Sequence, residues 1–209
     1  MTPNPGFALL CVTAMSGCTM SIRPPAAPLD PVTVHLVDYG DTSRLWLPAS
    51  TGTHASREHE SWLEWCYGDW EWYAMDHQSI FHGLIVFVVP TPGALGRREH
   101  PSSPTNDPAV LSASEVQYAI IVDRCRAEAL SQRLECEFRG HASQAHLNTS
   151  RGISFVPTDS PYWLGHQSST VIADWLRELG CQVDGFCLTA TFEVLPPTGQ
   201  RPQGSGRSD

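Results

Sequence analysis

The chain has 209 residues, 41% of them hydrophobic, which is enough for one domain with its own core. Its formal net charge of −9 argues against nucleic-acid binding, because phosphate recognition needs clustered cations. All 13 basic residues are arginine, which excludes a lysine-based mechanism such as a Schiff base. No run of 18 or more apolar residues follows the N-terminal leader, so no membrane-spanning helix is expected.

The N-terminus has the pattern of an exported protein, because a short apolar stretch over 7–12 is followed by small residues. Residues 15–18, with the sequence MSGC, resemble the lipobox of bacterial lipoproteins. The resemblance implies that 1–17 are a signal peptide and that Cys18 carries the lipid. The protein would then be anchored to a membrane on the periplasmic side of the cell envelope. Residues 1–6 lack the usual positive charge, so an apolar N-terminus without export, or a misassigned start, is the alternative.

The regions on either side of the expected domain differ from it in composition. Residues 18–31 contain four prolines and predict a stiff, extended tether. Residues 196–209 are rich in Pro, Gly, Gln, Ser and Arg, which predicts a disordered tail. A single domain is therefore expected over 32–195.

Within that domain, β-branched and apolar runs alternate with turn residues. Strands are predicted over 32–38, 45–47, 61–67, 83–89, 117–123, 152–156 and 188–194. Helical spacing of apolar residues predicts helices over 126–138 and 169–179, the second ended by Gly180. Asp69 is expected to cap a short helix that runs to Met75. Polar or proline-rich composition predicts loops over 49–60 and 90–114.

The early strands are too closely spaced for helical crossovers between them. An antiparallel sheet needs only short connections, whereas parallel strands need long ones. The sequence therefore predicts an α+β fold, with a mainly antiparallel sheet and packed helices.

The cysteines and histidines give no metal-binding pattern. Of the seven cysteines, Cys11 would leave with the leader and Cys18 would be acylated, so an odd number remains and full pairing is impossible. Cys181 and Cys187 flank a turn and are candidates for a disulfide in an oxidising compartment. There is no Cys-x-x-Cys pair, and the paired histidines are five residues apart rather than four. Neither a metal site nor a cofactor is expected.

Three segments together resemble the DUF2459 family of uncharacterised bacterial proteins. They are VHLVDYGDTSRLWLP at 34–48, EWCYGDWEWY at 64–73, and SST at 168–170 with the helix that follows. The resemblance covers roughly residues 32–195. That family is distantly similar to circularly permuted papain-like amidases and peptidases of the NlpC/p60 type, which implies a permuted papain-like fold here.

The resemblance also implies where a catalytic site would lie. In permuted papain-like proteins an early histidine activates a later cysteine at a helix N-terminus, where the helix dipole stabilises the thiolate. The position of the histidine falls on Thr42 and that of the cysteine on Ser168. Glu64 occupies a place from which a third polar group would orient the base. Both reactive groups are therefore replaced, and the implied site is degenerate.

Two interpretations of Ser168 stay open. The first is that Ser168 or its neighbour Ser169 caps the helix. The second is that Ser168 is a nucleophile, which would need His166 or His35 as a base. Trp70, Trp72 and His166 are also candidates for ligand contact, since aromatic rings stack on sugars; packing in the core is the alternative for the aromatic residues.

The function expected from these features is a cell-envelope lipoprotein on a papain-like scaffold with a degenerate catalytic site, in a binding or structural role. Its expected partners are the membrane, through the lipid on Cys18, and an envelope glycan or protein. The alternative is an amide or ester hydrolase that uses Ser168 as its nucleophile. A pure binding module is a third possibility, and fold alone does not separate the three.

Overall fold

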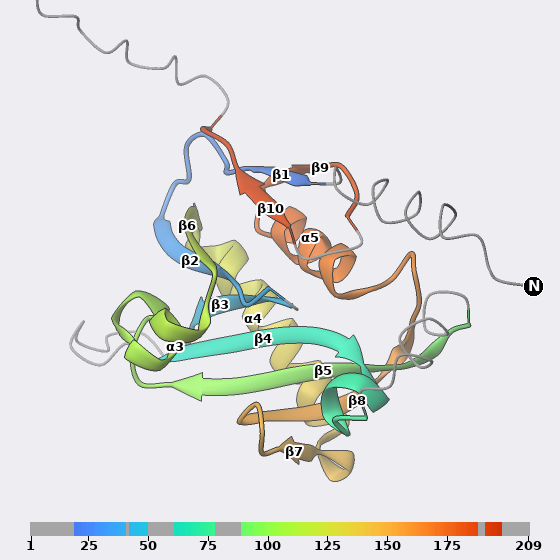
Figure 1. The fold of residues 1–209 in the computed structure, drawn as a ribbon. Coiled ribbons are helices and arrows are strands. Elements are labelled where there is room, and N and C mark those ends of the chain that lie inside the picture. Colours follow the sequence, from blue (N-terminus) through green and yellow to red (C-terminus); the bar gives the residue numbers. More distant parts are fainter. Residues whose placement is uncertain (1–18, 41, 50–60, 78–88, 188–190, 198–209) are drawn as a thin grey trace, which may run out of the picture.

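The computed structural model describes residues 19–40, 42–49, 61–77, 89–187 and 191–197 (Figure 1). Its strands are β1 (Met20–Arg23), β2 (Pro31–Asp38), β3 (Ser43–Pro48), β4 (Trp62–Asp69), β5 (Thr91–His100), β6 (Val116–Asp123), β7 (His146–Asn148), β8 (Ile153–Tyr162), β9 (Gln182–Asp184) and β10 (Phe192–Val194). Its helices are α3 (Pro108–Ala113), α4 (Arg124–Gly140) and α5 (Ser168–Glu178), with short turns η1 (Trp70–Ala74), η2 (Pro104–Asn106) and η3 (Ala142–Gln144).

Seven strands form the main sheet in the order β6-β2-β3-β4-β5-β8-β7. Every pair of neighbours in this sheet is antiparallel. A second sheet has the order β10-β1-β9, in which β1 is parallel to β10 and antiparallel to β9. The predicted α+β class with a mainly antiparallel sheet is confirmed.

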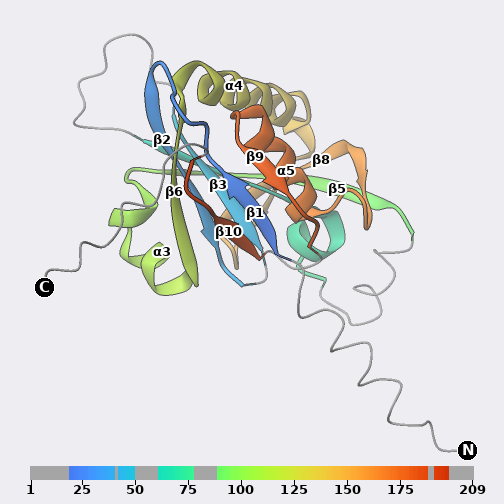
Figure 2. The ribbon, with the colours of Figure 1, turned by 90° about the horizontal axis from the view of Figure 1, so that it is seen from above.

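The main sheet is covered on both faces. Leu45 and Leu47 of β3 and Trp65 of β4 belong to the large core cluster, together with the buried residues of α4 and α5. The intervening residues of the same strands point to the other face, where α3 and η1 pack. Figure 2 shows α4 and α5 side by side over the sheet. All eight residues of β4 are therefore buried.

Helix α5 is held by the apolar face that its sequence predicts. Val171, Ile172, Trp175 and Leu176 are all buried in the large cluster. Full burial of each such side chain stabilises the fold by about 1.5–3 kcal/mol. Gly180 follows the helix with a φ of 90°, a left-handed conformation that glycine adopts without steric cost, so it ends the helix as predicted.

Most predicted elements are found near their predicted positions. The strands expected over 32–38, 45–47, 61–67, 117–123 and 152–156 are β2, β3, β4, β6 and β8. The two expected helices are α4 and α5, and the end of the last expected strand is β10, while residues 188–190 of that prediction lie outside the described residues. Asp69 caps η1, since its Oδ1 accepts a hydrogen bond of 2.8 Å from the Trp72 N–H.

Three predictions are corrected. The loop expected over 90–114 contains β5, η2 and α3. The tether expected over 18–31 is wrong for Met20–Arg23, which form β1 and bury Met20 and Ile22 in the core. Cys181 and Cys187 do not form the disulfide considered for them.

Several predictions lie outside the described residues. They are the signal peptide over 1–17, lipidation of Cys18, the loop at 50–60, the strand at 83–88 and the tail from 198 onward. Among the helices that the structure does describe, none is both long and apolar enough to cross a membrane.

Candidate functional site

The start of α5 is built from Gln167, Ser168 and Thr170. Gln167 is the N-cap, rather than either serine, and Ser168 is the first helical residue. The Thr170 hydroxyl accepts a hydrogen bond from the Gln167 N–H and donates one to the Gln167 carbonyl, both at 2.9 Å. Ser168 is buried, with 7% of its surface exposed. The predicted N-cap role of Ser168 is therefore wrong by one residue, while its place at the helix start is correct.

Tyr162, at the end of β8, interacts with the side chain and the backbone of Ser168. Burial, and to a smaller extent the charge of Asp69, raises the pKa of Tyr162 to about 12, against a small opposing effect of the hydrogen bond to Ser168. Tyr162 is therefore a neutral phenol near neutral pH. A neutral phenol offers its proton as a hydrogen-bond donor and is not a base for the serine.

His166 lies near this serine in the sequence, but its described contacts are to other groups. Its Nδ1 is 3.1 Å from the Tyr67 hydroxyl and 3.1 Å from the Pro161 carbonyl. The Tyr67 hydroxyl is also 3.0 Å from the Ser160 carbonyl, to which it donates. One consistent assignment puts the proton on Nδ1 of His166, shared between Pro161 and Tyr67. Within the described part of the chain, no imidazole is hydrogen-bonded to Ser168.

Thr42 lies at the same end of the sheet as the start of α5. Leu45 of β3 pairs with Trp65 of β4, and the strands are antiparallel, so the start of β3 at Ser43 and the later part of β4 at Tyr67 lie toward the same end of the sheet. Thr42 precedes Ser43 in the turn between β2 and β3 and is buried. Its carbonyl accepts a 3.0 Å hydrogen bond from the Tyr39 N–H, which closes the turn. The structure thus brings Thr42 and Ser168 to one end of the fold.

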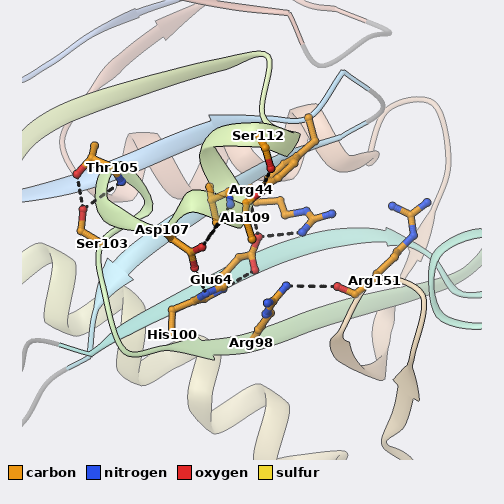
Figure 3. A network of polar contacts seen from close by, with 12 residues as sticks. Arg44, Glu64, Arg98, His100, Ser103, Thr105, Asp107, Ala109, Ser112 and Arg151 are labelled. Carbon is orange, nitrogen blue, oxygen red and sulfur yellow. Dashed lines mark hydrogen bonds and ion pairs between the residues drawn. The ribbon is translucent and has the colours of Figure 1, made fainter.

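Glu64 lies on the opposite face of the sheet from Ser168. Its neighbours Leu63 and Trp65 face α4 and α5, so the side chain of Glu64 points the other way, toward α3. Figure 3 shows it in a buried polar network. Its Oε1 accepts hydrogen bonds from Arg44 at 2.9 Å and Tyr39 at 3.2 Å. The prediction that Glu64 joins Thr42 and Ser168 in one site is wrong.

The electrostatics of Glu64 are those of a structural ion pair. Burial alone would raise the pKa of Glu64, but the hydrogen bonds and charges of His100 and Arg44 outweigh burial and hold that pKa below its usual range. Burial likewise works against the charged form of Arg44, and the facing carboxylate more than offsets it, so the pKa of Arg44 is raised. Glu64 is therefore an ionised hydrogen-bond acceptor bound by Arg44 and His100, and it is not a proton donor.

His100 extends this network to α3. Its Nε2 is 2.9 Å from Oε2 of Glu64, and its Nδ1 is 3.4 Å from Oδ2 of Asp107. Oδ1 of Asp107 accepts hydrogen bonds from the N–H groups of Ala109 and Val110 and so caps α3. The ring of His100 also lies 3.9 Å from that of Trp46. The network fastens α3 onto the sheet.

The other predicted contact residues are dispersed. Trp70 is half-buried against the cluster around Cys66 and Ala74, on the face opposite α5. Trp72 is half-buried in the same short turn, η1. Neither belongs with His166 on the α5 side, so the structure does not unite the three residues. The position of Cys18 lies outside the described residues.

Sequence reasoning missed Tyr162, which interacts with Ser168, and Tyr67, which is hydrogen-bonded to His166. It also missed Arg44 and His100, which bind Glu64. Arg44 had a usable signal, because it lies two residues from Trp46, the strand partner of Glu64, and so on the same face once β3 and β4 are paired. His100 fell inside the predicted loop, so nothing placed it on a strand. The two tyrosines are far apart in sequence, and only the folded sheet brings them together.

Two further features of the described residues concern possible binding sites. No group of three or more His, Cys, Asp or Glu side chains in the described ranges could hold a metal ion. A cavity of about 380 Å³ lies between α4 and the sheet, lined by Arg97, Glu135, Cys136 and Arg139 among others. The predicted site residues are not part of its lining.

The structure places a helix that begins at Ser168 against an antiparallel sheet. Comparison of the chain with protein-family models, with curated proteins and with solved structures gave no match.

Proposed function

We propose that this chain is a cell-envelope lipoprotein on a papain-like scaffold whose catalytic site is degenerate, and that it acts by binding or in a structural role. One observation carries the loss of catalysis: among the described residues no imidazole is hydrogen-bonded to Ser168, and His166 is bound to Tyr67 and Pro161 instead. The lipoprotein part of the proposal rests on the sequence around Cys18.

The chemistry of serine supports this proposal. A helix N-terminus carries about half a positive charge, which helps to ionise a thiol but not a hydroxyl of much higher pKa. A serine nucleophile therefore needs a base within about 2.6–3.2 Å. Thr42, at the same end of the fold, has no group that accepts a proton near neutral pH. Glu64 is on the other face and its carboxylate is already bound.

The alternative is an amide or ester hydrolase with Ser168 as nucleophile, and one observation favours it. Nδ1 of His166 is fixed by the Pro161 carbonyl and the Tyr67 hydroxyl. An imidazole held through one nitrogen keeps the other nitrogen available as a base, as in Ser-His-Asp sites. A movement of the 163–167 segment would be needed to bring that nitrogen to Ser168.

Hydrolysis assays decide between the two. The full chain, Ser168→Ala and Ser169→Ala are compared on peptide, amide and ester substrates. Ser169 is the matched control because it is the adjacent serine and its hydroxyl donates to the Cys187 carbonyl. We expect all three proteins to stay at background. Turnover by the wild type that is lost in Ser168→Ala and kept in Ser169→Ala would reject the degenerate site and establish the hydrolase.

A further inference from the structure

Three large apolar side chains are exposed where α5 begins. Trp163, Leu164 and Phe186 expose 46%, 37% and 44% of their surface. Two hydrogen bonds join the segments that carry them, because the Cys187 carbonyl accepts from Nε2 of Gln167 at 2.7 Å and from Oγ of Ser169 at 3.0 Å. We call the three apolar side chains the α5-end surface.

The N-terminal end of the described chain lies beside this surface. A side chain built at Gly185 would begin 2.8 Å from the Thr19 carbonyl oxygen, so Thr19 lies next to the residue that precedes Phe186. The pairing of Ser21 with Asp184 fixes this position. In Figure 1 the start of β1, the segment after β9 and the start of α5 lie at the same end of the molecule.

The position of β1 leaves only a short length of chain between Cys18 and the domain. Met20 is buried and paired with Phe192, and only Thr19 separates it from Cys18. Two residues of extended chain span about 7 Å. A lipid on Cys18 would therefore be attached within about 7 Å of Met20 along the chain, which is much less separation than a long tether would give.

The charge of this end also suits a lipid surface. The chain carries a net charge of −9, yet residues 160–173 contain neither an acidic residue nor an arginine. Asp184, close to Phe186, is paired with Arg23 at 3.2 Å. A neutral apolar end avoids repulsion by anionic headgroups, and tryptophan is suited to the membrane interface because one end of its ring is polar.

We propose that the α5-end surface inserts into the interface of a phospholipid bilayer as a second, non-covalent contact beside the lipid on Cys18. The inference rests on the proposed lipoprotein function, because Cys18 must be acylated for the bilayer to lie at this end. Acyl chains combined with a second membrane signal give stable attachment where a single chain is marginal. The contact also fixes the orientation of the domain, with the start of α5 toward the membrane.

Fluorescence quenching by brominated lipids tests the contact. The full-length protein is purified from membranes and reconstituted into vesicles of phosphatidylethanolamine and phosphatidylglycerol, with and without bromine on the acyl chains. We expect brominated vesicles to quench part of the tryptophan emission. This component should be lost in Trp163→Phe and kept in Trp72→Phe, a control on the opposite face of the sheet. Leu164→Asp, which leaves Trp163 as the fluorescent side chain, should weaken the quenching by brominated lipids.

Labelling with radioactive palmitate in the cells that express each protein distinguishes the lipid anchor on Cys18 from the bilayer contact of the α5-end surface. Label in the wild type and not in Cys18→Ala supports the anchor, and absence of label rejects the lipoprotein together with the contact that depends on it. Labelled protein whose quenching is absent, or equal in wild type and Trp163→Phe, overturns the bilayer contact and leaves the anchor standing. If acrylamide still quenches Trp163 on those vesicles, the α5-end surface stays in water and the bilayer contact is overturned.

Discussion

At the scale of single residues, the candidate site was predicted in part. The position of Ser168 at a helix start and of Thr42 at the same end could be inferred from the motifs. The face on which Glu64 lies could not, because every residue of β4 is buried and the strand shows no alternation of apolar and polar residues. Only the pairing of Glu64 with Trp46 and its contacts with Arg44 and His100 decide its orientation.

Loss of the Glu64 carboxylate is therefore expected to lower the free energy of unfolding. Glu64→Gln keeps the size of the side chain but leaves Arg44 buried without its countercharge, a change that costs about 3–5 kcal/mol in comparable buried pairs. The exposed Glu99→Gln, on the next strand, is the control and should shift the free energy of unfolding by about 0.5 kcal/mol or less. Urea unfolding followed by tryptophan fluorescence measures both. Equal small effects would show that the network does not hold the ion pair as described.

At the scale of elements, periodic segments were predicted and β5 was missed. Helix α5 and strand β2 have apolar spacing that indicates their type. Strand β5 contains Pro92, Gly93 and Gly96, a composition typical of loops. The structure explains the glycine at 96, since a side chain there would begin 2.6 Å from the Phe155 ring and would also overlap Cys66. A glycine that allows close packing within a strand cannot be told from a turn glycine in the sequence alone.

Gly96→Ala should consequently destabilise the sheet. The added methyl group has no room between β4 and β8, and overpacking of this kind costs about 1–3 kcal/mol. Gly140→Ala, at the end of α4, provides the same chemical change where the structure has nothing within 4 Å of the added atom. That control should be neutral or slightly stabilising, since alanine favours helix. Thermal unfolding of the two variants measures the contrast, and a Gly96→Ala protein as stable as Gly140→Ala would refute the packing argument.

At the scale of the whole molecule, the least predictable feature is that the two ends of the domain share one sheet. Strand β1 has only four residues and is followed by prolines, so its sequence indicates a linker. Its partners, β9 and β10, come about 160 to 170 residues later in the chain, as the pairings of Ser21 with Asp184 and of Met20 with Phe192 show. No local sequence pattern predicts such a pairing, because its stability comes from burial against distant residues and not from the β-propensity of its own residues.

The consequence is that Ile22 should behave as a core residue although it lies in a segment with the composition of a tether. Ile22 is fully buried, and it pairs with Val183 on one side and Val194 on the other. Ile22→Ala should lower the free energy of unfolding by about 2–5 kcal/mol, the range for removing a buried aliphatic side chain. Leu29→Ala, in the same segment but 97% exposed, should leave it nearly unchanged. Urea unfolding of the two variants measures the difference. A similar small effect in both would mean that residues 20–23 are not part of the folded unit. The linker between Cys18 and the domain would then be longer, and the α5-end surface would no longer be held next to the membrane.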